Sequence, residues 1–368
     1  MCISGCVDYI SLCAEVSQIK DKLMITIKDM AEMAGVSPTT VSNVLHGRTK
    51  KMSPDTLKKV QQVIEESKYV SNMGARLLAN YGSRLIGVIV TYDRNRDQSA
   101  VQDPFYSEII GALEQEIRKN EYFMLLYTSA NVDESVRMAS AWNVEGLIVL
   151  GCPPEDCPKL WERTNAPVVF IDSYFRDNKY DYYNVGLDDF SGGYEMTKHL
   201  IRRGHRRIAF LADSEQPVGV DYERLGGYKK ALAEADILFK EKDFIPLHFK
   251  KVIRHTQLTE FAQERLRDYT ALFFASDFYA SDAINTFFSV GLQIPGDISV
   301  AGFDDNIFAW HCRPALTTVQ QKVADKAYHA VKLMLQIIRG EECNGKNIHL
   351  PVKLIVRQSV IDIAPNGK

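Results

Sequence analysis

Residues 26–47, TIKDMAEMAGVSPTTVSNVLHG, decide the fold of the amino-terminal part of this 368-residue chain. The segment opens with apolar residues at the spacing of one helix face, Ile27, Met30, Ala31 and Ala34. Thr26 with Asp29 three residues later has the pattern of a capping box, and Gly35 follows the last apolar position. The pattern therefore predicts a short helix over residues 27–34.

A second helix is predicted directly after this glycine. Ser37 can cap it, and Pro38 occupies the first turn, where its missing N–H costs nothing. One face is apolar (Val41, Val44, Leu45), and the other carries short polar side chains at Thr39, Ser42, Asn43 and His46. A third helix starts with Ser53 and Pro54. Two short helices joined at a glycine indicate a helix-turn-helix, whose second helix enters the major groove of DNA. A generic three-helix bundle with a solvated polar face is the alternative.

Charge separates this segment from the rest of the chain. Between residues 24 and 84, nine Lys and Arg side chains oppose five Asp and Glu, so the segment carries +4 while the whole chain carries −3. A basic module on an acidic body predicts a polyanionic partner for the module alone. The seven cysteines are odd in number and loosely spaced, which favours a reducing cytoplasm over a disulfide framework.

The amino-acid sequence of this segment also resembles the sequences of a known protein family. TIKDMAEMAGVSPTTVSNVLHG, followed by SPDTLKKVQQVIEESKYVSNMGARLLA, closely resembles the DNA-binding headpiece of the LacI/GalR family of bacterial transcription regulators, from residue 26 to about residue 79. The resemblance implies that Pro38, Thr39 and Asn43 read bases. It places Thr40, Ser42 and His46 on or near the DNA backbone. Pro38 departs from the family in kind, since it can offer only an apolar contact, such as one to a thymine methyl group.

The stretch NMGARLLA, residues 72–79, resembles the hinge helix of that family. The resemblance implies a short helix in the minor groove of DNA, where Leu78 wedges between two base pairs. The other candidate contacts of this segment are Asn72, Ala75 and Arg76. A plain linker helix with Leu78 in a core is the alternative.

Beyond residue 84, buried strands alternate with helices. Apolar runs predict strands at residues 84–90, 122–128, 146–150, 167–172, 206–212, 271–277 and 298–305. Such runs, separated by helices, indicate parallel sheets covered on both faces. About ten strands are too many for one compact doubly wound sheet, so we expect two lobes. The most apolar local stretch, residues 85–90, is far too short to cross a bilayer.

Motifs of this region resemble the effector-binding core of the same family, which is itself similar to periplasmic sugar-binding proteins. They are DPFYSEIIGALE, GLDDFSGGYEMTKHLIRRGHRRIAFL, ERLGGYKKAL, IPGDISVAGFDD and PALTTV. The resemblance implies an α/β chain with a helix-turn-helix headpiece and a two-lobed periplasmic-binding-protein-like core of two doubly wound parallel sheets. We expect a disordered, dispensable extension at residues 1–23, a headpiece at 24–70, a hinge and linker at 71–83 and the core at 84–362. The first lobe should span residues 84–186, and the chain should return to it near residues 316–345. The second lobe should span residues 187–315 and 346–362.

Ligands of open parallel sheets bind at the carboxyl ends of strands, which here means the cleft between the lobes. Candidate residues stand at or near such ends, and each matches a family position that contacts effectors: Phe105, Tyr106, Asp172, Arg224, Ser276, Asp277 and Asp304. Carboxylates and an arginine suit sugar hydroxyls, and aromatic rings suit the apolar face of a sugar. We expect Arg224 and Asp304 to face each other across the cleft. Taken singly, each residue is more simply explained as a surface cap or turn residue, whereas the set as a whole favours a binding site. Ser276 replaces the Asn that several family members carry, and the loop at 91–104 is longer than usual.

Signatures of catalysis are absent from the sequence, which has no GxxxxGK[ST], no GxGxxG after a strand, no HExxH and no GxSxG. Cys152 and Cys157 have no second cysteine pair at zinc-ligand spacing. We therefore predict no catalytic residue, no metal and no cofactor.

Together these observations predict a cytoplasmic, homodimeric transcription regulator, a repressor, that binds double-stranded operator DNA and no membrane. Its operator affinity should be controlled by a small-molecule effector, a sugar or sugar derivative. A phosphorylated partner protein that acts as corepressor is an alternative. A sugar-binding protein that serves a transporter would need a signal peptide and lack a headpiece. A two-lobed sugar enzyme would need catalytic residues.

Overall fold

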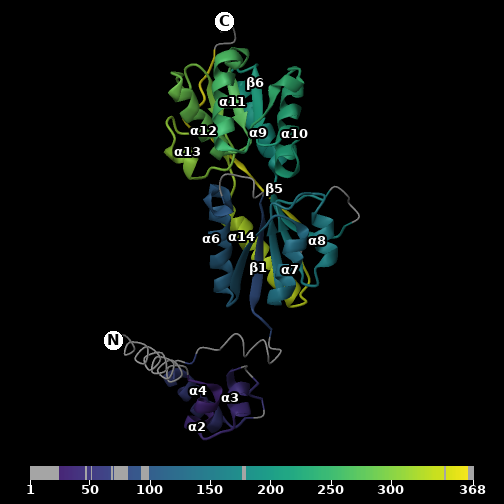
Figure 1. Ribbon diagram of the computed structural model, residues 1–368, viewed down its shortest axis with the longest axis vertical. Coiled ribbons are helices and arrows are strands. Elements are labelled where there is room, and N and C mark those ends of the chain that lie inside the picture. The colour runs from purple at the N-terminus through teal and green to yellow at the C-terminus, as the bar shows by residue number, and fades with distance from the viewer. Residues whose placement is uncertain are drawn as a thin grey trace, which may run out of the picture. The chain divides into compact units, whose positions relative to one another are not determined.

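The computed structural model describes residues 25–45, 48–50, 52–67, 69, 82–92, 99–175, 180–343 and 345–363. The chain divides into two compact units, Met1–Gly82 and Ser83–Lys368 (Figure 1). Several predicted features lie outside the described residues, namely the extension at 1–23, His46, Asn72, Ala75, Arg76 and Leu78. None of the helices in the described ranges is long and apolar enough to cross a membrane.

The first unit contains the three predicted helices, which are confirmed as α2 (Ile27–Ala34), α3 (Pro38–Leu45) and α4 (Pro54–Ser67). The predicted capping box is also present. The backbone N–H of Asp29 donates to Oγ1 of Thr26 at 3.2 Å, and the backbone N–H of Thr26 donates to Oδ2 of Asp29 at 2.8 Å. Gly35 ends α2 with φ 65°, a left-handed conformation that favours glycine. The helices pack around a small core of Met30, Ala31, Ala34, Val41, Val60 and Val63.

The first lobe of the second unit is built on a six-stranded parallel sheet in the order β11-β5-β4-β3-β1-β2. Its strands are β1 (Leu85–Thr91), β2 (Phe123–Ser129), β3 (Gly146–Leu150), β4 (Val168–Ile171), β5 (Tyr183–Leu187) and β11 (Asn347–Leu350). Helices α6 (Pro104–Lys119) and α14 (Val323–Ile338) cover one face, and α7 (Val132–Trp142) and α8 (Cys157–Arg163) the other (Figure 1). Because strand side chains alternate, Val88 and Val90 pack under α6 and α14 while Ile89 packs on the opposite face.

The second lobe repeats this plan with a four-stranded parallel sheet in the order β7-β6-β8-β9. Its strands are β6 (Ile208–Ala212), β7 (Phe244–Pro246), β8 (Ala271–Phe274) and β9 (Ser299–Ala301). Helices α9 (Asp189–Arg202) and α10 (Gly219–Glu234) cover one face, and α11 (Lys251–Glu264) and α12 (Asp277–Ser289) the other (Figure 1). Shorter helices of this lobe are α13 (Ile307–His311), η2 (Glu241–Asp243) and η3 (Leu266–Asp268), while η1 (Ala100–Gln102) precedes α6 in the first lobe. The predicted pair of doubly wound sheets is therefore confirmed.

The chain passes between the lobes after β5, between β10 (Thr318–Gln320) and α14, and between β11 and β12 (Lys353–Ile355). Strands β10 and β12 pair antiparallel beside the second lobe. One predicted boundary is wrong, because residues 347–350 do not belong to the second lobe. They form β11, which pairs with β5 and covers that otherwise open edge of the first sheet. The chain re-enters the second lobe only after Leu350.

Two glycines allow α9 and α10 to pack with their backbones in contact. A Cβ atom on Gly193 would lie 2.1 Å from the backbone oxygen of Arg224, and one on Gly227 would lie 2.0 Å from the backbone oxygen of Phe190. No side chain fits at either position. The GG pairs in SGGY and LGGY thus hold the start of α9 against the part of α10 that carries Arg224.

Candidate functional site

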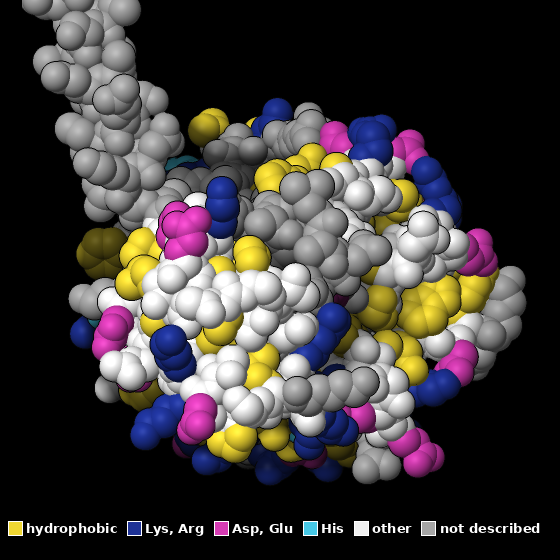
Figure 2. All heavy atoms as spheres, turned by 90° about the horizontal axis from the view of Figure 1, so that it is seen from below, with side chains coloured by type: hydrophobic (Ala, Val, Ile, Leu, Met, Phe, Trp, Pro, Cys, Tyr) yellow, Lys and Arg dark blue, Asp and Glu magenta, His cyan; other side chains and the backbone are white. Residues whose placement is uncertain are grey.

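The polar face of α3 is the candidate DNA-contacting surface of the first unit. Val41 is fully buried against α2 and α4, which turns the opposite side of the helix outward. Pro38 and Thr39 are exposed, and Thr40, Ser42 and Asn43 are partly exposed. Ser37 caps the start of α3, since its Oγ accepts a hydrogen bond from the backbone N–H of Thr40 at 3.1 Å. On the face drawn in Figure 2, basic and acidic side chains are interspersed and no single basic patch stands out among the described residues.

A cavity of about 470 Å³ lies between the two lobes of the second unit, and we call it the interlobe cavity. Its wall includes residues that follow β1, β3 and β4 in one lobe and β6, β8 and β9 in the other. The strand order reverses between β1 and β3 and again between β6 and β8. Open α/β sheets bind ligands at the carboxyl ends of strands near such reversals. The ligand-binding edge of each sheet therefore borders the same cavity.

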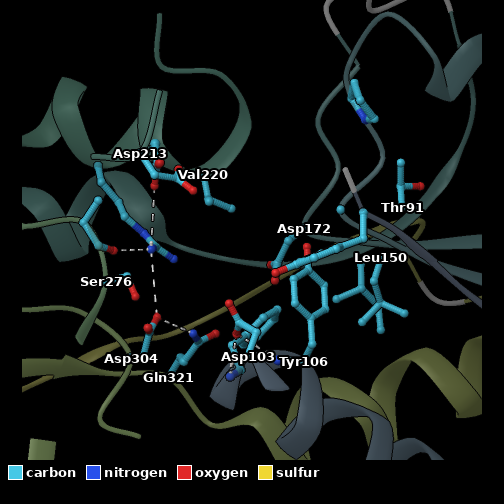
Figure 3. A pocket seen from close by; sticks show the side chains of 18 of the residues that line it. Thr91, Asp103, Tyr106, Leu150, Asp172, Asp213, Val220, Ser276, Asp304 and Gln321 are labelled. Atoms are coloured by element: carbon cyan, nitrogen blue, oxygen red, sulfur yellow. Dashed lines mark hydrogen bonds and ion pairs between the residues drawn. The ribbon is translucent and has the colours of Figure 1, made fainter. Parts of the chain in front are cut away.

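Six of the seven predicted effector contacts line this cavity: Phe105, Tyr106, Asp172, Arg224, Ser276 and Asp304. Figure 3 shows Asp103, Tyr106 and Asp172 on one side of it and Asp213, Ser276 and Asp304 on the other. The cavity thus receives aromatic, carboxylate and hydroxyl groups from both lobes.

Asp277 is the exception, and the prediction that it contacts an effector is corrected. Its side chain is fully buried and does not line the cavity. Its Oδ1 accepts a hydrogen bond from the Thr318 hydroxyl at 2.6 Å, and its Oδ2 accepts from the backbone N–H groups of Asp305 and Asn306 at 2.7 and 3.3 Å. Asp277 therefore fixes the turn after β9, a role that its position next to Ser276 does not reveal.

Arg224 is held rigidly at the second-lobe wall. Its Nε donates to Oδ1 of Asp189 at 2.8 Å, its Nη1 donates to the backbone oxygen of Ala275 at 2.7 Å, and its guanidinium lies 3.7 Å from the ring centre of Phe303. Burial disfavours the charged guanidinium, but Asp189, Asp304 and Asp221 more than offset this and raise its pKa above the usual value. Arg224 lies in the second turn of α10, which begins at Gly219.

Asp304 is a neighbour of Arg224 and does not face it across the cleft. Its Oδ1 lies 3.9 Å from Nη1 of Arg224, and both residues belong to the second lobe. The expected arrangement across the cleft is therefore wrong, because the end of β9 and the second turn of α10 adjoin within one lobe. Burial raises the pKa of Asp304 to about 7, an effect that Arg224 opposes and Asp103 reinforces.

A buried chain of polar groups links the two lobes at the cavity. Nζ of Lys326, on α14, donates to Oδ2 of Asp172 at 2.5 Å and to Oε1 of Gln321 at 2.9 Å. Nε2 of Gln321 in turn donates to Oδ1 of Asp304 at 2.7 Å. Asp172 and Asp304 have φ values of 54° and 126°, which are unusual for residues with a side chain. Both carboxylates that enter the cavity from opposite sheets therefore stand on strained backbone.

Sequence reasoning missed several residues of the cavity wall: Tyr92, Asp103, Asp213, Asp221, Tyr279 and Gln321. Asp213 follows β6 as Asp172 follows β4, so the same strand-end signal could have found it. Asp221 stands three residues before Arg224 on α10 and so lies on the same helix face. Gln321 lies in an interlobe connection, where no local pattern marks it. Among the described residues, no group of three or more His, Cys, Asp or Glu side chains is placed to hold a metal ion.

Comparison with protein-family models finds two matches. Residues 26–72 match the bacterial regulatory proteins of the lacI family, and residues 197–360 match the periplasmic binding protein-like domain. The first range contains the helices α2, α3 and α4, and the second contains most of the second lobe together with α14 and β11.

Relatives that match over 92% of this chain are also described as transcription regulators. The HTH-type transcriptional repressor PurR of Erwinia tasmaniensis is 32% identical over 347 residues, which cover 92% of this chain and 98% of the relative. HTH-type transcriptional regulator MalR of Clostridium butyricum is 29% identical over 92% of this chain and 100% of its own. Among solved structures, a Lac repressor dimer bound to operator and the anti-inducer ONPF superposes with a TM-score of 0.77, at 26% identity over 92% of this chain and 99% of that one. The transcriptional regulator CelR in complex with cellobiose superposes with a TM-score of 0.69, at 26% identity over 91% of this chain and 100% of that one.

Proposed function

Because this chain belongs to the LacI family of bacterial regulatory proteins, and is therefore a DNA-binding transcription regulator and not an enzyme, we propose that its interlobe cavity binds a small carbohydrate effector that controls operator affinity. The observation that carries the proposal is the convergence of Asp172, Arg224 and Asp304 with the rings of Phe105 and Tyr106 around one cavity. Its volume of about 470 Å³ suits a mono- or disaccharide. The similar regulator CelR has been solved with cellobiose, which supports this ligand class.

The headpiece, residues 24–70, is proposed to read the operator through α3. Pro38, Thr39 and Asn43 would contact base edges, and Thr40, Ser42 and His46 would contact the DNA backbone or lie near it. Asn72, Ala75, Arg76 and Leu78 of the hinge segment, residues 71–83, would contact the minor groove. The Lac repressor has been solved as a dimer on operator, which supports a homodimer here as well. A bacterial regulator that binds operator DNA would act in the cytoplasm.

Control of the operator requires that the effector bind two states of the protein with different affinity. The cavity wall belongs to both lobes, so a ligand that contacts both would favour one arrangement of the lobes over others. The polar chain Asp172–Lys326–Gln321–Asp304 crosses between the lobes at that wall and would be strained or relaxed by such a change.

The experiment first selects an operator from randomised duplex DNA with the full-length protein. Fluorescence anisotropy then measures operator affinity with and without each member of a carbohydrate panel. We expect at least one carbohydrate to change the operator dissociation constant by about 5- to 150-fold, the range typical of allosteric coupling. If the purified protein responds to no small molecule but does respond to a phosphorylated partner protein, the corepressor alternative replaces this proposal.

A variant of the hinge tests the DNA side separately. Leu78→Ala should weaken binding to the selected operator and leave binding to non-specific duplex nearly unchanged, because only the specific complex uses an apolar wedge to bend DNA. An unchanged operator affinity and bend angle in Leu78→Ala would show that this segment is not a hinge helix.

A further inference from the structure

Another hollow of the second unit lies away from the interlobe cavity, and we call it the distal pocket. It has a volume of about 670 Å³ and is lined by residues that shortly precede β6, β7 and β8, together with the end of α10 and the chain that follows it. The interlobe cavity lies at the carboxyl ends of the same strands, since Asp213 follows β6 and Ser276 follows β8. The two hollows therefore border opposite edges of one sheet and are separate sites.

The wall of the distal pocket carries more positive than negative charge. Its cations come from three segments of the chain and are Arg206, Arg207, Lys240, Lys242 and Arg267. Its carboxylates are those of Asp236, Asp243 and Asp268. The wall thus has a net charge of +2, although the chain outside residues 24–84 carries −7 overall. A positively charged hollow in an acidic body favours an anionic ligand.

Most of these cations have no carboxylate partner. Lys242 is the exception, since its Nζ lies 3.1 Å from Oδ2 of Asp268. Within the described ranges of the chain, no ion pair and no side-chain hydrogen bond is formed by the other four, Arg206, Arg207, Lys240 and Arg267. Asp243 is engaged by the backbone, because its Oδ2 accepts a hydrogen bond from the backbone N–H of Lys240 at 3.0 Å. Four cationic side chains are therefore available to an incoming anion.

The backbone that carries these cations is fixed by hydrogen bonds. The backbone oxygen of Arg207 accepts from the backbone N–H of Thr270 at 2.8 Å, which joins the segments before β6 and β8. The backbone oxygen of Lys242 accepts from Nη2 of Arg265 and from the hydroxyl of Tyr269, each at 2.9 Å. The three segments are thus held in position before a ligand arrives, which lowers the entropic cost of binding.

Arginine is especially well suited to phosphate groups. Its planar guanidinium can donate two parallel hydrogen bonds to the oxygens of one phosphate, and a phosphate monoester carries more negative charge at neutral pH than a carboxylate does. Cations that reach one pocket from three segments suit more than one such group. The same wall includes Leu232, Ile237 and Leu238, which offer apolar contacts to the organic part of a ligand. The pocket therefore favours an organic molecule with several phosphate oxygens.

We propose that the distal pocket binds a small molecule that carries two phosphate groups. Arg206, Arg207 and Arg267 donate hydrogen bonds to the phosphate oxygens. Lys240 supplies a further positive charge, and Leu238 contacts the organic part of the ligand. Nucleoside diphosphates and sugar bisphosphates share this chemistry. The proposal concerns a site separate from the interlobe cavity and holds whether or not that cavity binds a carbohydrate.

Calorimetry on the full-length protein tests the ligand class, at low ionic strength and in a magnesium-free buffer with EDTA. ADP, fructose bisphosphate and inorganic pyrophosphate each carry two phosphate groups, and AMP, fructose 6-phosphate and orthophosphate are their counterparts with one. Citrate is the polycarboxylate control. We expect ADP or fructose bisphosphate to bind at least about tenfold more tightly than its counterpart and than citrate, since one added hydrogen bond between charged groups contributes enough free energy for that ratio. The comparison of ADP with fructose bisphosphate distinguishes the two sources. No binding by either compound, or equally tight binding of citrate, would overturn the proposal.

Matched variants locate the site. Arg206→Gln and Arg267→Gln each remove one exposed cation from the distal pocket, and each should weaken binding of the preferred ligand by at least about fivefold. Arg137→Gln removes an exposed arginine of α7 in the first lobe, outside the pocket, and should bind as wild type does. Thermal unfolding confirms that all three variants are folded. Equal affinity in the three variants would place the anion elsewhere, such as at Arg224 in the interlobe cavity, and would overturn the assignment of the distal pocket.

Discussion

Nε of Arg224 lies 2.8 Å from Oδ1 of Asp189, and both side chains are almost completely buried. Asp189 also accepts a hydrogen bond from the hydroxyl of Tyr174 at 3.0 Å, and Tyr174 follows β4 in the other lobe. Arg224 therefore lines the ligand cavity and also, through Asp189, contributes to the junction between the lobes. Removing it should affect the stability of the core as well as ligand binding.

Arg224→Ala should lower the free energy of unfolding of the core by about 3–5 kcal/mol, because it leaves Asp189 as a buried charge without its partner. Urea unfolding measures this loss. Lys322→Ala is the control, since Lys322 and its partner Asp325 are both mostly exposed and 3.7 Å apart, and such pairs contribute under about 1 kcal/mol. Equal losses in the two variants would show that the Arg224–Asp189 pair has no special structural role.

The raised pKa values of Asp221 and Asp304 predict a pH dependence of stability. Each rises from an ordinary value of 3.8 to about 7 on folding, so the folded state binds more protons than the unfolded state between these values. The free energy of unfolding should therefore fall as the pH rises from about 4 to about 7. In Asp221→Asn this titration is removed, so the variant should gain stability relative to wild type as the pH rises. The exposed Asp236→Asn is the control, and a gain that is the same at every pH would contradict the assignment.

Gly193 offers a test of the contact between α9 and α10. Gly193→Ala would place a Cβ atom 2.1 Å from a backbone oxygen of α10, and overpacking of this kind costs about 1–3 kcal/mol. Gly111→Ala, on α6, meets no atom within 4 Å and should be neutral or stabilising by up to about 1 kcal/mol. Thermal unfolding of both variants checks the difference. Two equally stable variants would mean that the helices can separate without loss.

Asn43 is expected to read a base from the polar face of α3. Asn43→Ala should weaken operator binding by about 1–3 kcal/mol and relax the preference at one base pair of each half-site. Gln61→Ala, at an exposed position of α4, serves as the control and should change neither quantity. Anisotropy titrations against the selected operator and its single-base variants give both measurements. A uniform loss across all base variants would indicate that Asn43 contacts only the DNA backbone.

Local patterns predicted the parts of this fold that depend on local chemistry. The helices at 27–34, 38–45 and 54–67 follow from caps and apolar spacing, and strands such as β3 follow from continuous apolar runs. Strand β11 was missed because its alternation is weak, and only its pairing with β5 makes it a strand. Strand β7 is three residues long and carries too little pattern to be recognised.

The residues of the candidate site were likewise predictable only in part. Strand ends identified Asp172, Ser276 and Asp304 as cavity residues, since the carboxyl ends of parallel strands share an edge. The same rule failed for Asp277, because the direction of a side chain depends on long-range partners such as Thr318. The separation of Arg224 and Asp304 also depends on how α10 packs on its sheet, which no sequence spacing encodes.

The most direct test of the account is the operator affinity of the full-length protein with and without the carbohydrate that most raises its melting temperature. Fluorescence anisotropy on the selected operator should show a change of at least about fivefold in wild type. In Asp304→Asn the same carbohydrate concentration should change operator affinity much less, since the altered side chain contacts the ligand site and not DNA. An operator affinity that is unaffected by the carbohydrate in wild type, or affected equally in Asp304→Asn, would contradict control through the interlobe cavity.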